Sequence, residues 1–333
     1  MAGITSYGGY IPYYRLPKSV VGKAWGQPGG QGDKAVANFD EDSITMSVAA
    51  ARDCLNGIDP NTVDALLMAT TTSPYQERQN STIVSAALDL RREARNADLT
   101  NCLRSGTTAL LSAMDTINAG AANSVMVTAA DMRLGGAGGE NERAFGDGSA
   151  ALLLGDERVA VEFEGSYTLC EDFADYWRLS NDTFVRSWED RFGLDEGYTR
   201  FPVEAAAGVM NKCNLKPKDF AKACFYGPNS RRHVMLGRGM GFEPAQVQEP
   251  LLDTVGNTGA ALPLMILVAA LEEARPGDRI LLVSYGNGSD AIVLRVTDEI
   301  EKIRDRRGIT GHLAMKRTLD SYEKYLRWRG LVP

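Results

Sequence analysis

The sequence predicts an α/β protein whose two pseudo-repeated halves, each of βαβαβ type, stack as a five-layered α-β-α-β-α sandwich. Helical and apolar strand segments alternate along the chain, and one constant offset aligns four of them in order. The strand segments are short, apolar on both sides and rich in Val, Leu and Met. Such strands are typical of buried, mostly parallel sheets that helices cover on both faces.

The repeat starts with a helix, a turn that contains a proline and a short apolar strand, at 43–69 and again at 201–226. The two prolines, Pro60 and Pro217, are 157 positions apart (217 − 60). At the same offset a glycine ends a further helix and an apolar strand follows, which are local signals of a helix C-terminus and a buried strand. These later segments are helices 103–119 and 258–274 and strands 124–130 and 279–285.

The remaining segments suggest how the chain is divided. We expect a polar, Gly-rich loop at 131–146, an insertion between the repeats and a charged helical tail. The predicted organisation is an N-terminal half, an insertion, a C-terminal half and a tail that is a candidate partner-docking segment. Their boundaries are 1–164, 165–200, 201–297 and 298–333.

The composition of the chain disfavours several classes of function. Apolar residues make up 44% and charged residues 24% of 333 residues, and the net charge of −7 does not favour binding to nucleic acid. We expect no transmembrane helix, because no run of 18 or more apolar residues occurs, and no signal peptide. Five scattered cysteines without a C-x-x-C pair predict a reducing cytoplasm, no disulfide framework and no structural zinc or other metal site.

Cys102 is the main candidate nucleophile. It lies where a short polar strand at 97–101 meets the helix that starts near Leu103. A helix N-terminus lowers the pKa of a thiol, and its unpaired N–H groups can bind the oxyanion of a thioester under attack. The alternative is a small buried core residue, which is the interpretation preferred for Cys54, Cys213 and Cys224.

Two other patterns could carry chemistry. Asn257, in GNTGAALPLM, directly precedes a helix, so it is either an N-cap or an amide aimed at a carbonyl or an ordered water. Glycine-rich strand starts at 145–155 and 284–296 are either tight turns or places where backbone N–H groups approach a ligand. Neither is followed by G-K-S/T, so neither is a phosphate loop.

Several motifs together resemble the 3-hydroxy-3-methylglutaryl-CoA synthase family of the thiolase superfamily, with ketoacyl-ACP synthase III as a related family. They are YGGYIPYYRL, FDEDSITMSVAAA, the cysteine before a small-residue helix, EDFADYWR, GNTGAALPL and SYGNGSDA, in order along nearly the whole chain. The resemblance implies the thiolase fold and a dimer. It also implies acyl transfer from CoA to a cysteine, then condensation with a second acyl-CoA, with the CoA thioester as substrate and no tightly bound cofactor.

The resemblance assigns residues. The family's cysteine corresponds to Cys102 and its asparagine to Asn257, and SYGNGSDA would supply an oxyanion-hole N–H near Gly288 and Ser289. The weakest assignment is Trp177–Arg178 in EDFADYWR, which either lines a wall for pantetheine or adenine or only packs.

The sequence departs from the family at two positions. Tyr226 stands where the family has a catalytic histidine, and Thr71 stands where it has a general acid/base glutamate, with Glu77 as the nearest carboxylate. Threonine cannot remove an α-proton or protonate an alkoxide at neutral pH, so ordinary HMG-CoA synthase activity is not expected. His233 is either a substitute for the missing histidine or a surface residue beside two arginines, and His312 is expected to be structural or solvent-exposed.

The end of the chain, SYEKYLRWRGLVP, resembles family members that are fused to or paired with a zinc-ribbon/OB-fold protein, sometimes with a second thiolase-type chain. The resemblance therefore implies a separate partner subunit, with Tyr322, Tyr325, Trp328 and Arg329 as interface anchors. The alternative is a helix that packs back on its own domain.

Two hypotheses remain open from the sequence. The first is an acyl-CoA-processing acyltransferase that forms or cleaves a C–C bond with Cys102, using Asn257 and Tyr226 at an atypical active site. The second is a catalytically degenerate thiolase-fold subunit that scaffolds a complex with an active thiolase, as a homodimer or heterodimer, and a zinc-ribbon/OB-fold protein. The retained Cys102 and Asn257 favour the first, and the replaced Thr71 and Tyr226 positions favour the second.

Overall fold

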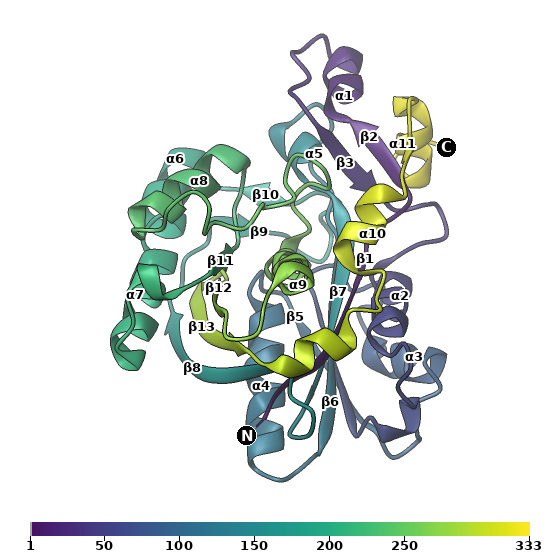
Figure 1. Cartoon of the computed structure of the whole chain (residues 1–333). Coiled ribbons are helices and arrows are strands. Elements are labelled where there is room, and N and C mark those ends of the chain that lie inside the picture. Colours follow the sequence, from purple (N-terminus) through teal and green to yellow (C-terminus); the bar gives the residue numbers. More distant parts are fainter. Residues whose placement is uncertain (1) are drawn as a thin grey trace.

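The computed structural model describes residues 2–333; Met1, the first residue of the predicted N-terminal half, lies outside the described residues. Its main feature is a nine-stranded sheet with the strand order β11-β12-β13-β8-β1-β7-β6-β4-β5 (Figure 1). The strands are β1 Gly3–Tyr10, β4 Ala65–Thr70, β5 Arg95–Thr100, β6 Ser124–Met132, β7 Asp147–Gly155, β8 Val161–Cys170, β11 Lys222–Phe225, β12 Arg279–Val283 and β13 Gly288–Val296.

The sheet is mixed, so the prediction of mostly parallel strands is wrong. Only the pairs β4–β5, β4–β6 and β11–β12 are parallel, whereas β1–β7, β6–β7, β1–β8, β12–β13 and β8–β13 are antiparallel. The physical reason is connection length. Only residues 284–287 join β12 to β13, and so short a link can connect antiparallel but not parallel neighbours.

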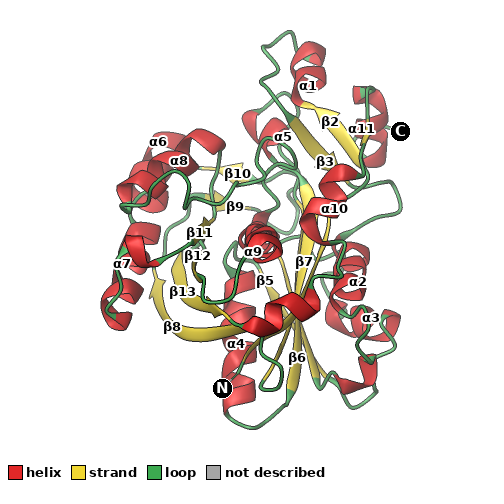
Figure 2. Ribbon diagram, in the orientation of Figure 1, coloured by secondary structure: helices red, strands yellow, loops and turns green. Residues whose placement is uncertain are grey.

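Helices form the other layers. The main helices are α2 Ser43–Cys54, α3 Asn80–Ala87, α4 Ser105–Asn118, α7 Phe201–Cys213, α8 Ser230–Gly239 and α9 Leu262–Glu273. In the centre of Figure 2, α9 packs on β1 and β7 of one half and on β11 and β12 of the other. Its residues 262–271 are all buried, as expected for a helix that is apolar all round. With α4 beside α9, α2 and α3 outside one half and α7 outside the other, the predicted five layers are confirmed.

The two halves meet where β1 pairs with β8 through only two residue pairs, Gly3 with Glu162 and Ile4 with Val161. The predicted repeat is visible in the elements themselves. The 3₁₀ turns η1 Pro60–Thr62 and η3 Pro217–Asp219 start 157 residues apart (217 − 60), and so do α4 and α9 (262 − 105). β7 and β13 start only 141 residues apart (288 − 147). The shared offset is therefore lost after α4 and α9, because the loops before β7 and β13 differ in length.

The segment predicted as an insertion begins inside the sheet, because β8 continues to Cys170. Beyond it lie a two-stranded hairpin, β9 Tyr176–Trp177 with β10 Arg186–Ser187, and then α6 Asp190–Phe192 and the π-helical turn η2 Gly193–Tyr198. The predicted loop at 131–146 contains the end of β6 and the short helix α5 Glu140–Ala144. The division of the chain into four parts stays a prediction.

A small lobe brings a segment that follows β1 together with the C-terminal segment. It contains β2 Tyr14–Pro17, α1 Lys18–Ala24, β3 Asp33–Val36, β14 Arg317–Thr318 and α11 Tyr322–Trp328, while 3₁₀ helix η5 Asp298–Ile303 and helix α10 Gly308–Ala314 lead into it (Figure 1). The four predicted partner anchors all contact their own chain here. Tyr325 is buried, Arg329 forms a buried ion pair with Asp147, and Trp328 packs edge-on against Tyr14. The helix packs on its own domain, as the alternative predicted, and docking of a partner to the tail stays a prediction.

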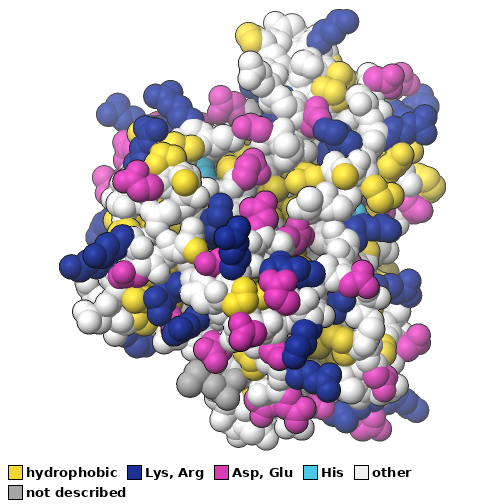
Figure 3. Space-filling view, viewed as in Figure 1, with side chains coloured by type: hydrophobic (Ala, Val, Ile, Leu, Met, Phe, Trp, Pro, Cys, Tyr) yellow, Lys and Arg dark blue, Asp and Glu magenta, His cyan; other side chains and the backbone are white. Residues whose placement is uncertain are grey.

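Over residues 2–333, no helix is long and apolar enough to cross a membrane, and no group of three or more His, Cys, Asp or Glu side chains could hold a metal ion. All five cysteines are free thiols, with Cys54 and Cys224 buried and Cys213 half-buried. On the face seen in Figure 3, basic and acidic side chains are interspersed.

Candidate active site

Cys102 occupies the turn between β5 and α4, as predicted. Asn101, just before it, has the left-handed φ of 68°, and the Cys102 carbonyl accepts the Ser105 N–H at 3.0 Å. Asp290 on β13 fixes the start of α4, because its carboxylate pairs with Arg104 at 3.0 Å and accepts the Thr107 hydroxyl at 2.7 Å. The thiol therefore lies where a strand end of the first half meets the β12–β13 loop of the second.

The thiol is half-buried and hydrogen-bonded. Its Sγ lies 3.3 Å from the carbonyl oxygen of Gly286, to which it donates, and 3.9 Å from Oδ1 of Asn287. Burial raises the pKa of the Cys102 thiol, although the backbone N–H and the charge of Arg104 oppose this rise. Burial therefore acts against the lowering of the thiol pKa that a place near a helix N-terminus favours.

Glycine is required at position 286 for this contact. Its φ is 148°, and a Cβ there would lie within about 3 Å of the backbone of Leu103 and Arg104. The β12–β13 loop therefore reaches the thiol through Gly286 and Asn287. Gly288 and Ser289, predicted to supply the oxyanion N–H, lie in β13, and the Ser289 hydroxyl donates to the Ser284 carbonyl.

A pocket of about 130 Å³ opens beside the thiol. It brings together four residues that the sequence singled out, Cys102, Thr71, Trp177 and Arg178. Arg178 donates to the Thr71 carbonyl at 3.1 Å, which connects the β9–β10 hairpin to the end of β4. The remaining residues of this wall are Thr72, Asn101, Leu103, Arg133, Asp175, Tyr176, Val185, Gly286 and Asn287.

Thr71 does not present a free hydroxyl to this pocket. Its hydroxyl donates to Oδ2 of Asp131 at 2.9 Å and its N–H donates to Oδ1 at 2.6 Å. Thr70, Thr72 and the N–H of Ala260 also donate to this fully buried carboxylate. Glu77 is exposed and lines neither this pocket nor the larger one described below.

Tyr226 and Asn257 form a second buried pair. Nδ2 of Asn257 donates to the Tyr226 hydroxyl oxygen at 2.7 Å, and Oδ1 accepts the N–H of Gly259 at 3.0 Å. Asn257 therefore holds both the tyrosine and the first N–H of the 3₁₀ turn η4 Gly259–Ala261, which leads into α9, while the N-cap position of this turn is Thr258. Burial raises the pKa of Tyr226, with the charge of Arg133 opposing it, so the phenol is neutral near pH 7.

The tyrosine lies in a cluster of aromatic rings. The Tyr198 hydroxyl donates to the Tyr226 carbonyl at 2.9 Å, and the Tyr285 hydroxyl donates to Asp175 at 2.6 Å. The Tyr226 and Tyr285 rings are 6.0 Å apart.

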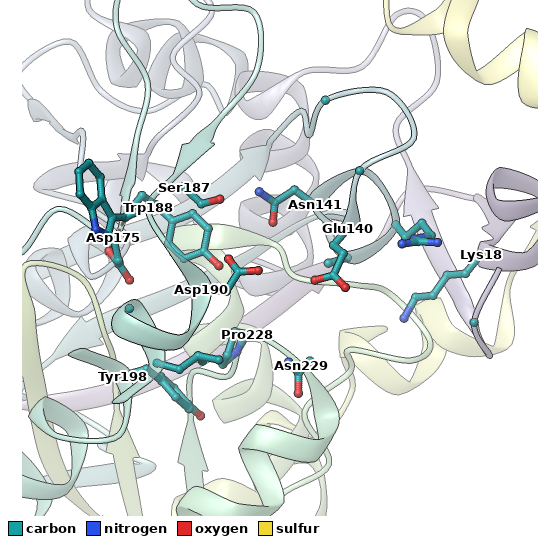
Figure 4. A pocket seen from close by; sticks show the side chains of 18 of the residues that line it. Lys18, Glu140, Asn141, Asp175, Ser187, Trp188, Asp190, Tyr198, Pro228 and Asn229 are labelled. Carbon is teal, nitrogen blue, oxygen red and sulfur yellow. Dashed lines mark hydrogen bonds between the residues drawn. The ribbon is translucent and has the colours of Figure 1, made fainter. Parts of the chain in front are cut away.

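Tyr226 lines a different, larger cavity of about 820 Å³. This cavity runs from Lys18 and the glycines at 29–30 to Asp175 and Tyr198 (Figure 4). Asp175 and Tyr176 line both cavities, so these two residues stand between the tyrosine side and the thiol side. The structure thus joins Tyr226 to Asn257, and Cys102 and Thr71 line one pocket. Tyr226 lines the adjoining larger cavity, whereas Asn257 lies behind it and lines neither.

His233 is buried, so the surface interpretation is wrong, and it is not an active-site substitute either. Its ring stacks on Phe225 at 4.2 Å because the apolar face of α8 packs toward β11, and it lines neither cavity. Burial lowers the pKa of His233 to about 4. His312 is also buried, edge-on to Tyr10, so its structural interpretation is correct.

Sequence reasoning missed Asp131, near the end of β6, Arg133, directly after it, and Asp175. A sequence pattern could have found the first two. β4, β5 and β6 are parallel, so their carboxyl ends meet at one edge; Thr71 and Arg133 directly follow β4 and β6, and Cys102 lies two residues after β5. Polar residues just after such strands are the natural place to look for a site.

Solved structures share this fold. One, described as HMG-CoA synthase complexed with CoA, aligns with a TM-score of 0.88 and 20% identity, over 98% of this chain and 89% of that one. Another, 3-oxoacyl-[acyl-carrier-protein] synthase III from Aquifex aeolicus VF5, aligns with a TM-score of 0.79 and 20% identity, over 89% of this chain and 100% of that one. The family profile "3-Oxoacyl-[acyl-carrier-protein (ACP)] synthase III C terminal" matches residues 210–296. The chain has the fold of the thiolase-superfamily condensing enzymes.

Relatives that align over nearly the whole chain identify the family within this class of enzymes. A protein of Methanopyrus kandleri is 32% identical over 98% of this chain and 97% of its own, and one of Pyrococcus furiosus is 34% identical over 98% and 95%. Both are named hydroxymethylglutaryl-CoA synthase. The chain belongs to the hydroxymethylglutaryl-CoA synthase family of acyl-CoA condensing enzymes, and the resemblance inferred from its motifs is confirmed.

Proposed function

We propose that this protein is an acyltransferase that processes acyl-CoA, in which Cys102 accepts the acyl group of a CoA thioester. The observation that carries the proposal is the position of the thiol, at the turn between β5 and α4 and facing a pocket. The names of the relatives and the CoA in a solved neighbour support a CoA thioester as the acyl donor. No further cofactor is needed for this chemistry.

In the proposed acyl transfer, one bond to the carbonyl carbon forms as another breaks. The Cys102 sulfur, as thiolate, attacks the thioester carbonyl, and the bond from that carbon to the CoA sulfur breaks. The proton that Cys102 gives up goes to the departing CoA sulfur, so acyl-Cys102 and free CoA result. Unpaired N–H groups at the start of α4 are the proposed donors to the oxyanion of the tetrahedral intermediate.

The proton chemistry around the thiol differs from that of an ordinary HMG-CoA synthase. Thr71 replaces the family glutamate, and both its hydroxyl and its N–H are held by Asp131, so it offers no base to an α-proton. Tyr226 replaces the histidine and remains a neutral donor because its pKa is raised. We therefore propose that Asn257 and Tyr226 donate hydrogen bonds to the carbonyl of the second substrate.

These donors serve C–C bond formation and cleavage equally. Condensation, thiolysis and retro-aldol cleavage all pass through negative charge on a carbonyl oxygen, which neutral donors in a buried site stabilise. The larger cavity, at about 820 Å³, has the size of a small-molecule site and is proposed to admit this second substrate. Trp177 and Arg178 would contact the donor near the thiol.

The test is acylation of the purified protein by a panel of CoA thioesters, read by intact mass. We expect one acyl group per chain on wild type, located at Cys102 by peptide mapping, and none on Cys102→Ser. Cys170→Ser is the matched control because Cys170 is exposed and lines neither cavity, so it should acylate like wild type. Absence of an acyl-Cys102 adduct with every thioester would refute the proposal.

One observation favours a second candidate function, a scaffold. Burial raises the pKa of the Cys102 thiol, and Gly286 holds its proton, so no activating base is in contact with it. As a scaffold, the chain would form a homodimer or a heterodimer with another thiolase-fold chain. A zinc-ribbon/OB-fold protein would complete the complex. Co-expression with such partners, followed by acyl mapping, would place the acyl group on the partner chain only.

A further inference from the structure

Arg133 is a buried cation at the wall of the Cys102 pocket. It directly follows β6, only 4% of it is exposed, and it lines this pocket but not the larger cavity. Within residues 2–333 it forms no ion pair with a carboxylate, and its Nη1 is buried without a hydrogen-bond partner. A buried guanidinium is costly unless an anion pairs with it. Arg133 interacts electrostatically with Tyr226 and Asp175, but no carboxylate among the described residues forms an ion pair with it.

The neighbouring carboxylates are engaged elsewhere. Asp131 accepts hydrogen bonds from the threonines at 70–72 and from Ala260, and Asp175 accepts from the Tyr285 hydroxyl and the Tyr176 N–H. The guanidinium is instead held by aromatic rings, 4.1 Å from the centroid of Phe145 and 5.5 Å from that of Tyr176. Stacking fixes the plane of a guanidinium and leaves its edge free to bind a planar anion.

The pocket around the thiol is positive. Two guanidiniums, those of Arg133 and Arg178, line it, whereas Asp175 is its only lining carboxylate among the residues that the structure describes. A positive, enclosed wall beside a nucleophile selects substrates with negative charge near the reacting carbon.

We propose that Arg133 is a specificity-determining residue that binds a carboxylate at the far end of the acyl group on Cys102. The acyl donors would then be CoA monothioesters of short dicarboxylic acids, since a pocket of about 130 Å³ holds only a short chain. This inference rests on the proposed acyl transfer to Cys102. It adds a substrate class, because a neutral acyl group would leave the guanidinium without a counterion.

The first test compares two donors of equal chain length, succinyl-CoA and butyryl-CoA, by the rate at which Cys102 is acylated. A charge-assisted bidentate contact should favour succinyl by at least about tenfold in wild type. Arg133→Met should bring this ratio close to one, and Arg133→Lys should keep part of it, because lysine retains the charge without the planar fork. Arg186→Met is the control: Arg186 pairs with Asp182 on the surface and lines neither cavity, so the wild-type ratio should persist.

Equal rates for the two donors in wild type would overturn the inference. So would a parallel loss of both rates in Arg133→Met with the ratio preserved, which is the result expected if Arg133 served the oxyanion of every thioester. A thermal melt of each variant detects a folding defect. If Arg133→Met is misfolded, the ratio of the two acylation rates in Arg133→Lys is compared with that of wild type instead.

The second test needs no CoA chemistry, so it separates failure of this inference from failure of the proposed function. Iodoacetate and iodoacetamide differ only in charge, and exposed Cys170 of the same chain serves as the reference thiol. The ratio of iodoacetate to iodoacetamide labelling should be about tenfold higher at Cys102 than at Cys170, and Arg133→Met should abolish the difference. A raised ratio without any acylation would support the anion site and refute the acyltransferase, whereas equal ratios at the two cysteines would refute the anion site.

Discussion

At the scale of single residues, Asn257 shows how one side chain serves both the fold and the site. Its Oδ1 accepts the Gly259 N–H in the turn before α9 and its Nδ2 donates to the Tyr226 hydroxyl, so both ends of the amide have partners. Both residues are almost completely buried. An amide held at both ends cannot rotate, and the tyrosine is therefore held at one place in the wall of the larger cavity.

This pairing gives a prediction for Tyr226→Phe. The variant leaves Nδ2 of Asn257 buried without its acceptor, which should lower the free energy of unfolding by about 1–3 kcal/mol. Urea denaturation measures the change. Tyr75→Phe removes a hydroxyl from a 43% exposed tyrosine and should change it by less than about 0.5 kcal/mol. Equal stability of Tyr226→Phe and wild type would show that the amide finds another partner.

At the scale of elements, α11 is a helix whose polar side chains form hydrogen bonds with other parts of the same chain. The Tyr322 hydroxyl donates to Glu142 at 2.7 Å and accepts from Trp25 at 2.8 Å. Just past the helix, Arg329 pairs with Asp147, at the first residue of β7, and both side chains are buried. The C-terminal helix is thus anchored to the central sheet, and its interior-facing residues are not available to a partner.

Two arginines near this helix make a matched comparison. Arg329→Met leaves the Asp147 carboxylate buried without its cation and should destabilise the protein by about 3–5 kcal/mol. Arg327→Ala removes the exposed pair with Glu323, at 2.9 Å, and should cost no more than about 0.5 kcal/mol. Chemical denaturation of the two variants measures both values. Similar losses for both variants would mean that the Asp147 contact is not a buried ion pair in solution.

The elements also show what could be predicted from sequence. Local hydrophobic periodicity indicates the helices and strands, and Pro60 and Pro217 mark equivalent turns. The repeat and its layers were therefore predictable from the sequence. Strand direction and the β1–β8 junction depend on pairings between distant segments, which no local pattern contains. Arg133 follows β6 in a Gly-rich polar stretch that is typical of a solvated loop, yet it is buried, with its guanidinium over the rings of Phe145 and Tyr176. His233 follows two arginines, yet the packing of α8 on β11 buries it.

At the scale of the whole molecule, polar groups sit where the two halves meet. Asp290 of the second half holds Arg104 and Thr107 of the first, and Asp131 of the first half holds the Ala260 N–H of the second. The thiol and the Tyr226–Asn257 pair lie on either side of these contacts. Relative movement of the halves would therefore disturb the cysteine turn and the tyrosine together, which makes the stability of the whole fold a condition for the chemistry.

That stability should depend on two buried histidines in the acid range. Burial lowers the pKa of His233 and of His312 to about 4, whereas an unfolded histidine has a pKa of about 6.5. Between these values the unfolded chain binds more protons than the folded one, so the free energy of unfolding falls as pH falls below about 6.5 and is unaffected above it. Each histidine should contribute a loss of about 2 kcal/mol between pH 7.5 and about pH 5.

Urea denaturation at the two pH values measures this loss in wild type and in His233→Phe and His312→Phe. Each variant should lose about 2 kcal/mol less than wild type, because a phenyl ring binds no proton in either state. Asp175 and Glu272 have pKa values that burial raises, so they act in the opposite direction, and comparing variants at each pH removes their contribution. An unchanged pH dependence in His233→Phe would mean that the His233 ring is hydrated in the folded protein, and that α8 does not seal it against β11.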